Sequence, residues 1–495
     1  MNTGIAVRLV LYFGAVVSLR TPGQAVVKPP TSERKKGRRN IPLDLERRCQ
    51  MHERHILSAI IYLLLTVVVS TMSSSISNRL FRTENPYIED VIDKYNSMNI
   101  PNLIYLAMGS SHWPPPDEAV KRLSNDLLFS IANEDIGSSN YVMSREINRY
   151  GGIMGSDTLR SRIKQRFTSR GLNMEDLEIV ITNGANQALF NVVATLCDDS
   201  DKVILLAPYY FSQKLSLQLI NADIRICTFN KETLYPNWDE LNWIIQNDKK
   251  KTKAIFLTSP NNPSGLVWSR ENILKLIDIC RNDDIWLVAD QTYYEFLYDN
   301  SKHIFPSIEE FHYDKIIHIF SFSKSYGIPG YRVGFLAYHT SLNYLSDSFR
   351  KLQDTIPTHT TMLSQRMACH CLDVDDEYYG INGITWVDDK IKCLEEVRKK
   401  LWLVVKEHQT VLTSGAFYFL VPVPSGVSEE DAIDILAKKF RVLLMPGSPF
   451  GAPNYMRLSY GSIHPTQVLL AIDNIKAGLE YLRDVGMSQG KSYLK

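Results

Sequence analysis

The sequence lacks the two glycine-rich loops that mark P-loop and dinucleotide-binding sites. It contains neither G-x-x-x-x-G-K-[ST] nor G-x-G-x-x-G. It also has almost no net charge, +1 from 55 Lys and Arg against 54 Asp and Glu, so its overall charge gives no case for a nucleic-acid partner. After about residue 77 there is no internal repeat and no low-complexity tract. These absences argue against nucleotide-binding, nucleic-acid-binding and repeat proteins.

A disulfide framework and a zinc site are also not expected. The seven cysteines are odd in number and scattered, and most lie within apolar runs, which is typical of reduced, buried thiols. The pair in "ACHCLD" has the wrong spacing for zinc and lacks a second pair, so we expect no metal site. The cysteines are Cys49, Cys197, Cys227, Cys280, Cys369, Cys371 and Cys393.

Residues 1–77 differ from the rest of the chain. The basic stretches "RKKGRRN" and "LERRCQMHERH" precede an uncharged apolar run, Ile56–Met72. The run is slightly short for a spanning helix and slightly long for a signal-peptide core. The interpretations left open are a membrane anchor with a cytoplasmic N-terminus, a cleaved leader beginning near Met51, and an over-extended reading frame. The basic and apolar patterns do not decide the cellular compartment.

From Leu177 onward, short runs rich in Ile, Val and Leu alternate with amphipathic segments. This alternation predicts an α/β fold with a mostly parallel central sheet covered by helices on both faces. Helical patterns dominate after Lys351 and are followed by strand-like "GAFYFLV", "VLLMPG" and "YMRLSYG". They predict a second, smaller α+β domain. We expect an extension at 1–77, an N-terminal arm with part of the small domain at 78–122, a large domain at 123–355 and the small domain at 356–495.

Polar residues follow several of the predicted strands at the point where each strand ends. Ligands of open α/β sheets bind beyond the carboxyl ends of the strands, so these side chains are expected to face one crevice. They supply a loop that can bind an anion, an aromatic ring, an amide, a carboxylate and an amine. The groups are Gly184-Ala185-Asn186, Pro208-Tyr209-Tyr210, Asn261-Asn262, Asp290 and Ser321 to Lys324.

This set of groups fits pyridoxal 5′-phosphate (PLP). A lysine in a partly desolvated cleft, such as Lys324, loses its proton readily and forms a Schiff base with an aldehyde. A buried carboxylate holds a pyridine nitrogen protonated, which makes the ring an electron sink. Backbone N–H groups of "NGAN", opening a helix, bind a phosphate, and an aromatic ring stacks on a flat cofactor. Taken singly, each of these residues also has an ordinary structural explanation, as a solvated loop lysine, a helix N-cap or a packed side chain.

Seven motifs in order carry a family resemblance: "RYGGIMGSDTLRSRI", "ITNGANQAL", "PYY", "SPNNPSG", "VADQTYYEF", "SFSKSYGIPGYRVGF" and "MRLSYG". Over roughly Asn78 to Gly486 the chain resembles the class I aminotransferases of PLP fold type I. The resemblance implies that Lys324 is the catalytic residue, which binds PLP covalently and shuttles the proton. It implies that Asp290 pairs with the pyridine nitrogen and that Tyr293 and Asn262 both hydrogen-bond the ring oxygen.

The resemblance also implies how the phosphate and the substrate are held. Tyr210 would stack on the ring, and Arg457 would bind the substrate α-carboxylate, a bidentate task suited to guanidinium. Gly109 would lie where the N-terminal segment closes over the substrate. Tyr150 matches a tyrosine that reaches the phosphate of the neighbouring subunit, which implies a homodimer with shared sites. The implied phosphate ligands are Gly184, Ala185, Asn186, Ser321 and Arg332, with Ser323 as an addition.

A narrower resemblance bears on the substrates. "MGSSHWPPPDEAV", "PYYFSQ", "KLQDTIP" and "GAPNYMRLSYG" look like the plant aromatic aminotransferases, which pair methionine or an aromatic amino acid with phenylpyruvate or indole-3-pyruvate. Trp113 would then be an apolar wall for the substrate side chain, or would only anchor its segment by packing. No motif supplies a second arginine for a distal carboxylate, which disfavours a dedicated aspartate enzyme.

Two alternatives remain open at this stage. A PLP-dependent carbon–sulfur lyase, or an enzyme like aminocyclopropane-carboxylate synthase, would keep the same site residues. A non-catalytic protein built on the same domain would normally lose the lysine or carry a fused DNA-binding module. Here Lys324 is present, and the N-terminal extension shows no helix-turn-helix pattern.

Overall fold

The computed structural model describes residues 77–132, 147–247 and 250–492. It divides the chain into two units, residues 1–82 and residues 83–495. The first contributes the short helix α3 (Asn78–Arg82) to the described residues, and every other element belongs to the second. The apolar run at 56–72 lies outside the described residues. Within the described ranges, no helix is both long and apolar enough to cross a membrane.

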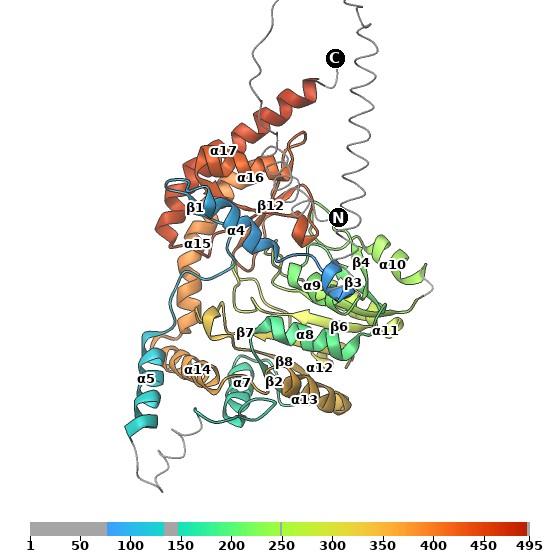
Figure 1. The fold of residues 1–495 in the computed structure, drawn as a ribbon, viewed down its shortest axis with the longest axis vertical. Coiled ribbons are helices and arrows are strands. Elements are labelled where there is room, and N and C mark those ends of the chain that lie inside the picture. The colour runs from blue at the N-terminus through green and yellow to red at the C-terminus, as the bar shows by residue number, and fades with distance from the viewer. Residues whose placement is uncertain (1–76, 133–146, 248–249, 493–495) are drawn as a thin grey trace, which may run out of the picture. The chain divides into compact units, whose positions relative to one another are not determined.

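A seven-stranded sheet forms the centre of the second unit (Figure 1). The strand order is β2-β8-β7-β6-β5-β3-β4, and only β8 runs antiparallel to its neighbours. This confirms the mostly parallel central sheet expected from the alternating apolar runs. The strands are β2 (Leu177–Thr182), β3 (Lys202–Leu206), β4 (Asp223–Cys227), β5 (Thr252–Thr258), β6 (Trp286–Asp290), β7 (Ile316–Ser321) and β8 (Gly334–His339).

Helices cover both faces of this sheet because its strands are apolar on both sides. In β3, Val203 and Leu205 pack with α8, α9 and α13, whereas Ile204 and Leu206 pack with α10, α11 and α12. Alternate residues of a strand point to opposite faces, so a continuous apolar run serves two helical layers. The helices are α8 (Ala185–Leu196), α9 (Phe211–Leu219), α10 (Trp238–Gln246), α11 (Arg270–Asn282), α12 (Ile308–Phe311) and α13 (Ser346–Thr355).

Several helices begin at a residue whose side chain caps them. Ser156 accepts a hydrogen bond from the third residue of α7 (Asp157–Ser169), and Thr361 does the same for α14 (Met362–Asn382). Thr385 and Asp388 form a reciprocal capping box at α15 (Trp386–Val405). Such caps satisfy N–H groups that have no partner within the helix.

A smaller antiparallel sheet, β11-β12-β9, confirms the expected second sheet. Its strands are β9 (Tyr418–Pro422), β11 (Met445–Pro446) and β12 (Tyr455–Ser459). Near it, β1 (Ile104–Tyr105) pairs in parallel with β10 (Val442–Leu443). Helices α15 and α16 (Glu429–Phe440) both pack on α17 (Pro465–Ser492). The pairing of β1 with β10 joins the N-terminal arm to the C-terminal part of the chain.

The remaining helices link these layers. In α4 (Tyr87–Ser97), the Tyr95 hydroxyl donates to Asp434 of α16. Helix α5 (Asp117–Ala132) packs on α14 and crosses the domain boundary expected after residue 122. The domain boundaries expected from the sequence stay predictions. The described part of the chain also contains four short 3-10 helices, η1 (Pro329–Tyr331), η2 (Thr340–Leu345), η3 (Lys406–His408) and η4 (Ser448–Phe450).

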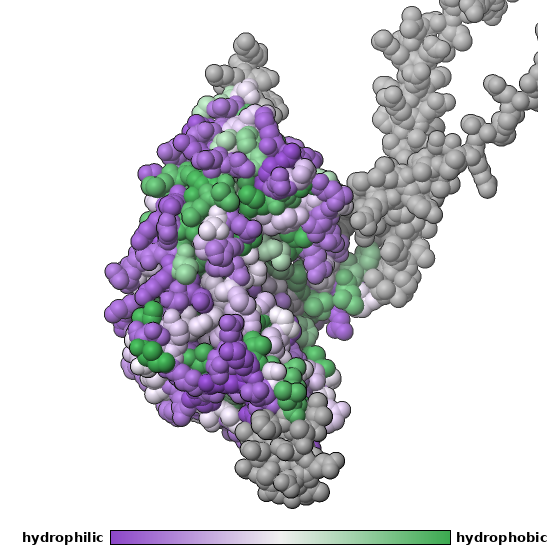
Figure 2. Space-filling view, turned by 90° about the vertical axis from the view of Figure 1, so that its left-hand side faces the viewer, coloured by the Kyte–Doolittle hydropathy of each residue, from purple (hydrophilic) through white to green (hydrophobic). Residues whose placement is uncertain are grey.

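The face in Figure 2 is mostly hydrophilic, with separate apolar patches between polar residues. Exposed apolar side chains of the second unit come from many elements, among them Leu128 in α5, Ile381 in α14 and Leu470 in α17. Scattered apolar side chains are normal on a protein surface. They point to no particular binding function.

A buried ion cluster ties α7 to α14. Arg166 is 3% exposed and pairs with the fully buried carboxylate of Asp375 and with Asp376, whose oxygen lies 3.0 Å from Nη1. Glu295 lies 3.5 Å from Arg166 and 2.8 Å from Arg170. Removing one partner of such a cluster leaves an uncompensated buried charge. The cluster reaches the segment that follows β6, which carries Tyr293.

We predict that Asp375→Ala lowers the free energy of unfolding by about 3 kcal/mol or more, because it leaves Arg166 buried without its closest carboxylate. Urea titration followed by circular dichroism measures the loss. Asp157→Ala is the matched control, since Asp157 pairs with Arg160 but is 90% exposed, and should cost below about 1 kcal/mol. Equal losses in the two variants would contradict the prediction.

Candidate active site

A cavity of about 490 Å³ lies at the carboxyl ends of the parallel strands. It is large enough for a cofactor and a small substrate. Most residues singled out from the sequence line it, although they come from separate segments between residues 109 and 457. They are Gly109, Ala185, Asn186, Tyr210, Asn262, Asp290, Tyr293, Ser321, Ser323, Lys324, Arg332 and Arg457.

Three of the expected residues do not line this cavity. Gly184 lies just behind its wall, at the start of α8. Trp113 lines a neighbouring cavity of about 540 Å³, so its role as a substrate wall stays a prediction. Tyr150 is 86% exposed and packs edge-on against His359; its expected contact needs a second copy of the chain.

Lys324 follows β7 and its amine faces the cavity. Burial, together with the smaller effect of the Arg332 and Arg457 charges, lowers the pKa of this amine to about 8. No carboxylate or other hydrogen-bond partner of the Nζ atom occurs among the described residues. The amine therefore becomes neutral, and nucleophilic, near physiological pH.

Asp290 ends β6 and is buried beside the same cavity. Burial raises the pKa of its carboxyl group, against two hydrogen bonds from Thr292 that lower it. Both bonds, from the backbone N at 3.1 Å and from Oγ1 at 2.7 Å, go to Oδ1. Among the described residues, Oδ2 has no donor. A cationic N–H group of a ligand would fill that place and stabilise the charged carboxylate.

The N-terminus of α8 lies against the Arg332 guanidinium. Gly184 has φ 78°, and a Cβ there would lie 2.6 Å from Arg332 Nη2, so a larger residue would displace the guanidinium. Arg332 itself has φ 53°, rare for a residue other than glycine. Ser323 N donates to Ser321 Oγ at 3.2 Å, which leaves the Ser321 hydroxyl hydrogen for a ligand. Helix N–H groups, a guanidinium and hydroxyls together suit a phosphate.

Arg457 in β12 is 1% exposed. Its Nη1 donates to Asn262 Oδ1 at 3.0 Å and its Nη2 to the Ala107 carbonyl at 2.5 Å. The guanidinium lies between the rings of Tyr418 and Phe450, 4.9 and 4.6 Å from their centroids. Its Nε is buried and has no partner among the described residues. An unpaired buried donor is costly, which favours binding of an anionic group.

The segment before α5 is hydrogen-bonded to the lysine loop. Ser111 Oγ donates to the Lys324 carbonyl at 2.7 Å, and Trp113 Nε1 donates to the Ser325 carbonyl at 3.1 Å. The Trp113 ring also stacks on Phe296. Trp113 thus has an anchoring contact of the kind that was the alternative to a substrate wall.

The sequence reasoning missed several cavity residues and one tyrosine behind them. Ser110 and Thr292 were detectable, because each adjoins a residue that was chosen. Tyr418 was not, because "GAFYFLV" looks like an ordinary strand; its hydroxyl lies 2.5 Å from that of Tyr293. The missed lining residues are Ile88, Met108, Ser110, Leu189, Thr258, Thr292 and Pro329.

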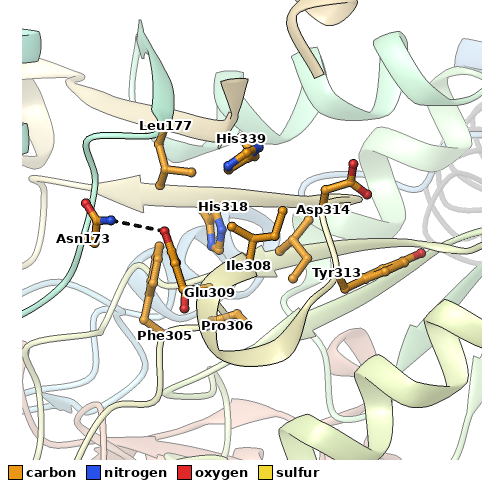
Figure 3. Close-up of a pocket in the computed structure, with 12 residues that line it drawn as sticks. Asn173, Leu177, Phe305, Pro306, Ile308, Glu309, Tyr313, Asp314, His318 and His339 are labelled. Atoms are coloured by element: carbon orange, nitrogen blue, oxygen red, sulfur yellow. Dashed lines mark hydrogen bonds between the residues drawn. The ribbon is translucent and has the colours of Figure 1, made fainter. Parts of the chain in front are cut away.

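Another pocket lies between α12 and the sheet, lined by His318, His339 and Glu309 among others (Figure 3). Asn173 donates to Glu309 at its edge, at 3.2 Å. Its volume of about 10 Å³ is near the minimum for one water molecule. It is therefore no site for an amino acid.

Known proteins identify the family. The family model of aminotransferase class I and II matches residues 106–475. The chain belongs to this family. The aromatic aminotransferase ISS1 of Arabidopsis thaliana is 29% identical over 83% of this chain and 98% of its own length. An aspartate aminotransferase of Thermotoga maritima is 26% identical over 73% of this chain and 87% of its own.

Solved structures confirm the fold of this aminotransferase. An aspartate aminotransferase of Thermus thermophilus, a double mutant, aligns over 82% of this chain and 99% of its own, with a TM-score of 0.69 and 21% identity. An aromatic aminotransferase of Pyrococcus horikoshii aligns over 80% and 99%, with a TM-score of 0.66 and 22% identity. The family match confirms the expected enzyme class, and these structures confirm its fold.

Aminotransferases of this class use PLP, and the cavity fits it on three observations. Among the described residues, the Lys324 amine has no hydrogen-bond partner, and about half of it is neutral at pH 8. No cation in that part of the chain pairs with the buried Asp290 carboxylate. The start of α8, with Arg332 and Ser321, offers unused donors for a phosphate. Each group lacks a partner that PLP would supply.

We predict that Lys324 of the cofactor-free protein reacts with a small amine-directed reagent with a pH midpoint near 8. With the pKa lowered to about 8, half of the amine is neutral at pH 8, against fewer than about one in a hundred at the ordinary value of 10.5. Peptide mass spectrometry across a pH series measures the labelled fraction. Lys121, 72% exposed, reports the reagent's general reactivity, and a Lys324 profile that coincides with it would contradict the prediction.

Proposed function

We propose that this aminotransferase moves an amino group between an aromatic or methionine-like amino acid and a 2-oxo acid such as phenylpyruvate or indole-3-pyruvate. The observation that carries the proposal is the single cavity in which Lys324, Asp290 and Arg457 meet beside apolar side chains. The likeness to the aromatic aminotransferase of Arabidopsis supports the substrate class. Amino and oxo acids each bring one carboxylate, which suits one buried arginine.

We propose that PLP is the resident cofactor. When bound, it supplies an electron sink that makes the substrate Cα proton acidic. Lys324 would hold it covalently, Asp290 would face its ring nitrogen, and Tyr210 would stack on the ring. The ring oxygen would be held by Tyr293 and Asn262. The phosphate ligands would be Gly184, Ala185, Asn186, Ser321, Ser323 and Arg332.

Lys324 has the properties of the group that moves the Cα proton. A general base works best when its pKa lies near the operating pH, and burial brings this amine to about 8. The Ser111 hydroxyl donates to the Lys324 carbonyl and so fixes the main chain from which this side chain extends. The main chain is thus held while the side chain stays free to reach the substrate.

Arg457 and Asn262 would orient the substrate. Arg457 is held by Asn262 Oδ1 and by the Ala107 carbonyl, so its plane does not depend on the ligand. Such preorganisation lowers the entropy cost of binding a carboxylate. Gly109 would lie over the bound substrate. The Cα–H bond is then directed by contacts that exist before binding.

The lining favours an apolar substrate side chain. Ile88, Met108 and Leu189 line the cavity, and among its described residues the only cations are Lys324, Arg332 and Arg457. Two of these serve the phosphate and the reaction, and the third serves the α-carboxylate. No cation is left for a distal carboxylate in the described lining, which disfavours aspartate.

We further propose a homodimer with shared sites, in which Tyr150 reaches the phosphate of the neighbouring subunit. Support comes from the resemblance and from the exposure of Tyr150, which is 86% exposed and outside its own cavity. A tyrosine that serves the other subunit must lie at the surface of its own.

We predict that phenylalanine, tryptophan and methionine donate their amino group to phenylpyruvate or indole-3-pyruvate faster than aspartate donates to 2-oxoglutarate. Lys324→Ala should lower transfer by ~10³-fold or more, because it removes both nucleophile and base. Chromatography of the amino acids formed measures both. Lys253→Ala, an exposed lysine on β5, is the control. Ammonia and a thiol, without a new amino acid, would instead indicate the lyase.

We predict that Arg457→Lys lowers kcat/KM for phenylalanine by about 10²-fold, since an ammonium group cannot replace a bidentate guanidinium. Phenethylamine lacks the carboxylate, so its slower reaction should change little. Half-reaction rates for the two amines measure the ratio. An equal loss for both would show that Arg457 does not bind the carboxylate.

A further inference from the structure

Tyr418, which the sequence did not single out, lies behind the cavity and contacts two of its residues, Tyr293 and Arg457. It is the first residue of β9 and is 0% exposed. Its hydroxyl oxygen lies 2.5 Å from that of Tyr293, and its ring lies 4.9 Å from the Arg457 guanidinium. The small sheet thereby places one phenol against groups expected to hold both the cofactor and the substrate.

The position of this hydroxyl also explains a glycine. A Cβ at residue 109 would lie 2.7 Å from the Tyr418 hydroxyl oxygen. A methyl group at Gly109 would therefore push the hydroxyl out of place. The chain leaves this space to the hydroxyl.

The two phenol groups carry two hydroxyl hydrogens, and the hydrogen bond between them uses only one. Burial raises the pKa of Tyr293 well above its usual value and that of Tyr418 to about 12, so both are protonated at neutral pH. Each hydroxyl carries one hydrogen, and one of the two lies between the oxygens. The second has no other acceptor among the described residues. Tyr293 lines the cavity and Tyr418 does not.

We propose that Tyr418 is a positioning residue: its hydroxyl donates to the Tyr293 oxygen and thereby directs the Tyr293 hydrogen into the cavity. The proposal rests on the proposed function, in which Tyr293 donates to the cofactor ring oxygen. Consecutive hydrogen bonds polarise one another, so the Tyr418 bond also makes Tyr293 a stronger donor. Without it, the Tyr293 hydroxyl is free to rotate.

The test is a pH titration of the visible absorbance band of the PLP-loaded protein. A hydrogen bond to the deprotonated ring oxygen stabilises that form and lowers the pH midpoint. Tyr418→Phe keeps the ring on Arg457 and removes only the hydroxyl. It should raise the midpoint by about 0.5 unit, a fraction of what one hydrogen bond contributes. Tyr293→Phe should raise it further.

The double variant separates positioning from general damage. If Tyr418 acts through Tyr293, then Tyr418→Phe shifts nothing further once residue 293 is phenylalanine. Tyr460→Phe is the matched control, because Tyr460 is 1% exposed beside β12 and donates to the Ala416 carbonyl, away from Tyr293. Its midpoint should equal that of the wild type.

Gly109→Ala gives a second test should Tyr418→Phe fold poorly. Its methyl group crowds the Tyr418 hydroxyl and should also raise the midpoint, but not in the Tyr293→Phe background. An unchanged midpoint in Tyr418→Phe, or a shift that persists without the Tyr293 hydroxyl, overturns the inference alone. A wild-type protein with no visible band overturns the proposed function as well.

Discussion

An excess of positive charge around one cavity is the constraint on which this candidate active site depends. Among the described residues that line it, the cavity holds Lys324, Arg332 and Arg457 against one carboxylate, Asp290. Burial, and secondarily repulsion from the two arginines, lowers the Lys324 pKa to about 8, so the amine gives up its proton near that pH. What remains favours anions, one at the start of α8 and one at Arg457. The nucleophile and the two anion sites are therefore one electrostatic arrangement.

The large sheet brings these groups to one edge and holds them there. Asp290 and Ser321 end neighbouring strands β6 and β7, which pair along their length. Arg457 comes from the other sheet but is bonded to Asn262, which follows β5. The hydrogen bonds to Ala107, Lys324 and Ser325 then join the N-terminal arm to both sheets. Packing and hydrogen bonds in the rest of the fold offset the free-energy cost of holding like charges close together.

Sequence reasoning recovered what strand ends and motifs carry. Asp290, Lys324 and Arg457 lie at the ends or in the middle of apolar runs, where a charged residue stands out. It did not identify contacts between residues that are far apart in the sequence. The carbonyl that Trp113 bonds is 212 residues away, and Tyr293 is 125 residues from Tyr418. Nothing local in "HWPPP" or "GAFYFLV" records such a contact, because burial and register bring the partners together only in the folded chain.

The bond between Arg457 and the Ala107 carbonyl spans 350 residues. Closing so long a loop costs chain entropy. On the ribosome, Ala107 emerges long before Arg457 exists, so the large sheet can assemble while the arm has nothing to close on. The carboxylate site proposed at Arg457 would then be among the last parts of the cavity to form. A chain that ends before β12 would hold Lys324 and the large sheet without the arginine proposed to bind the substrate carboxylate.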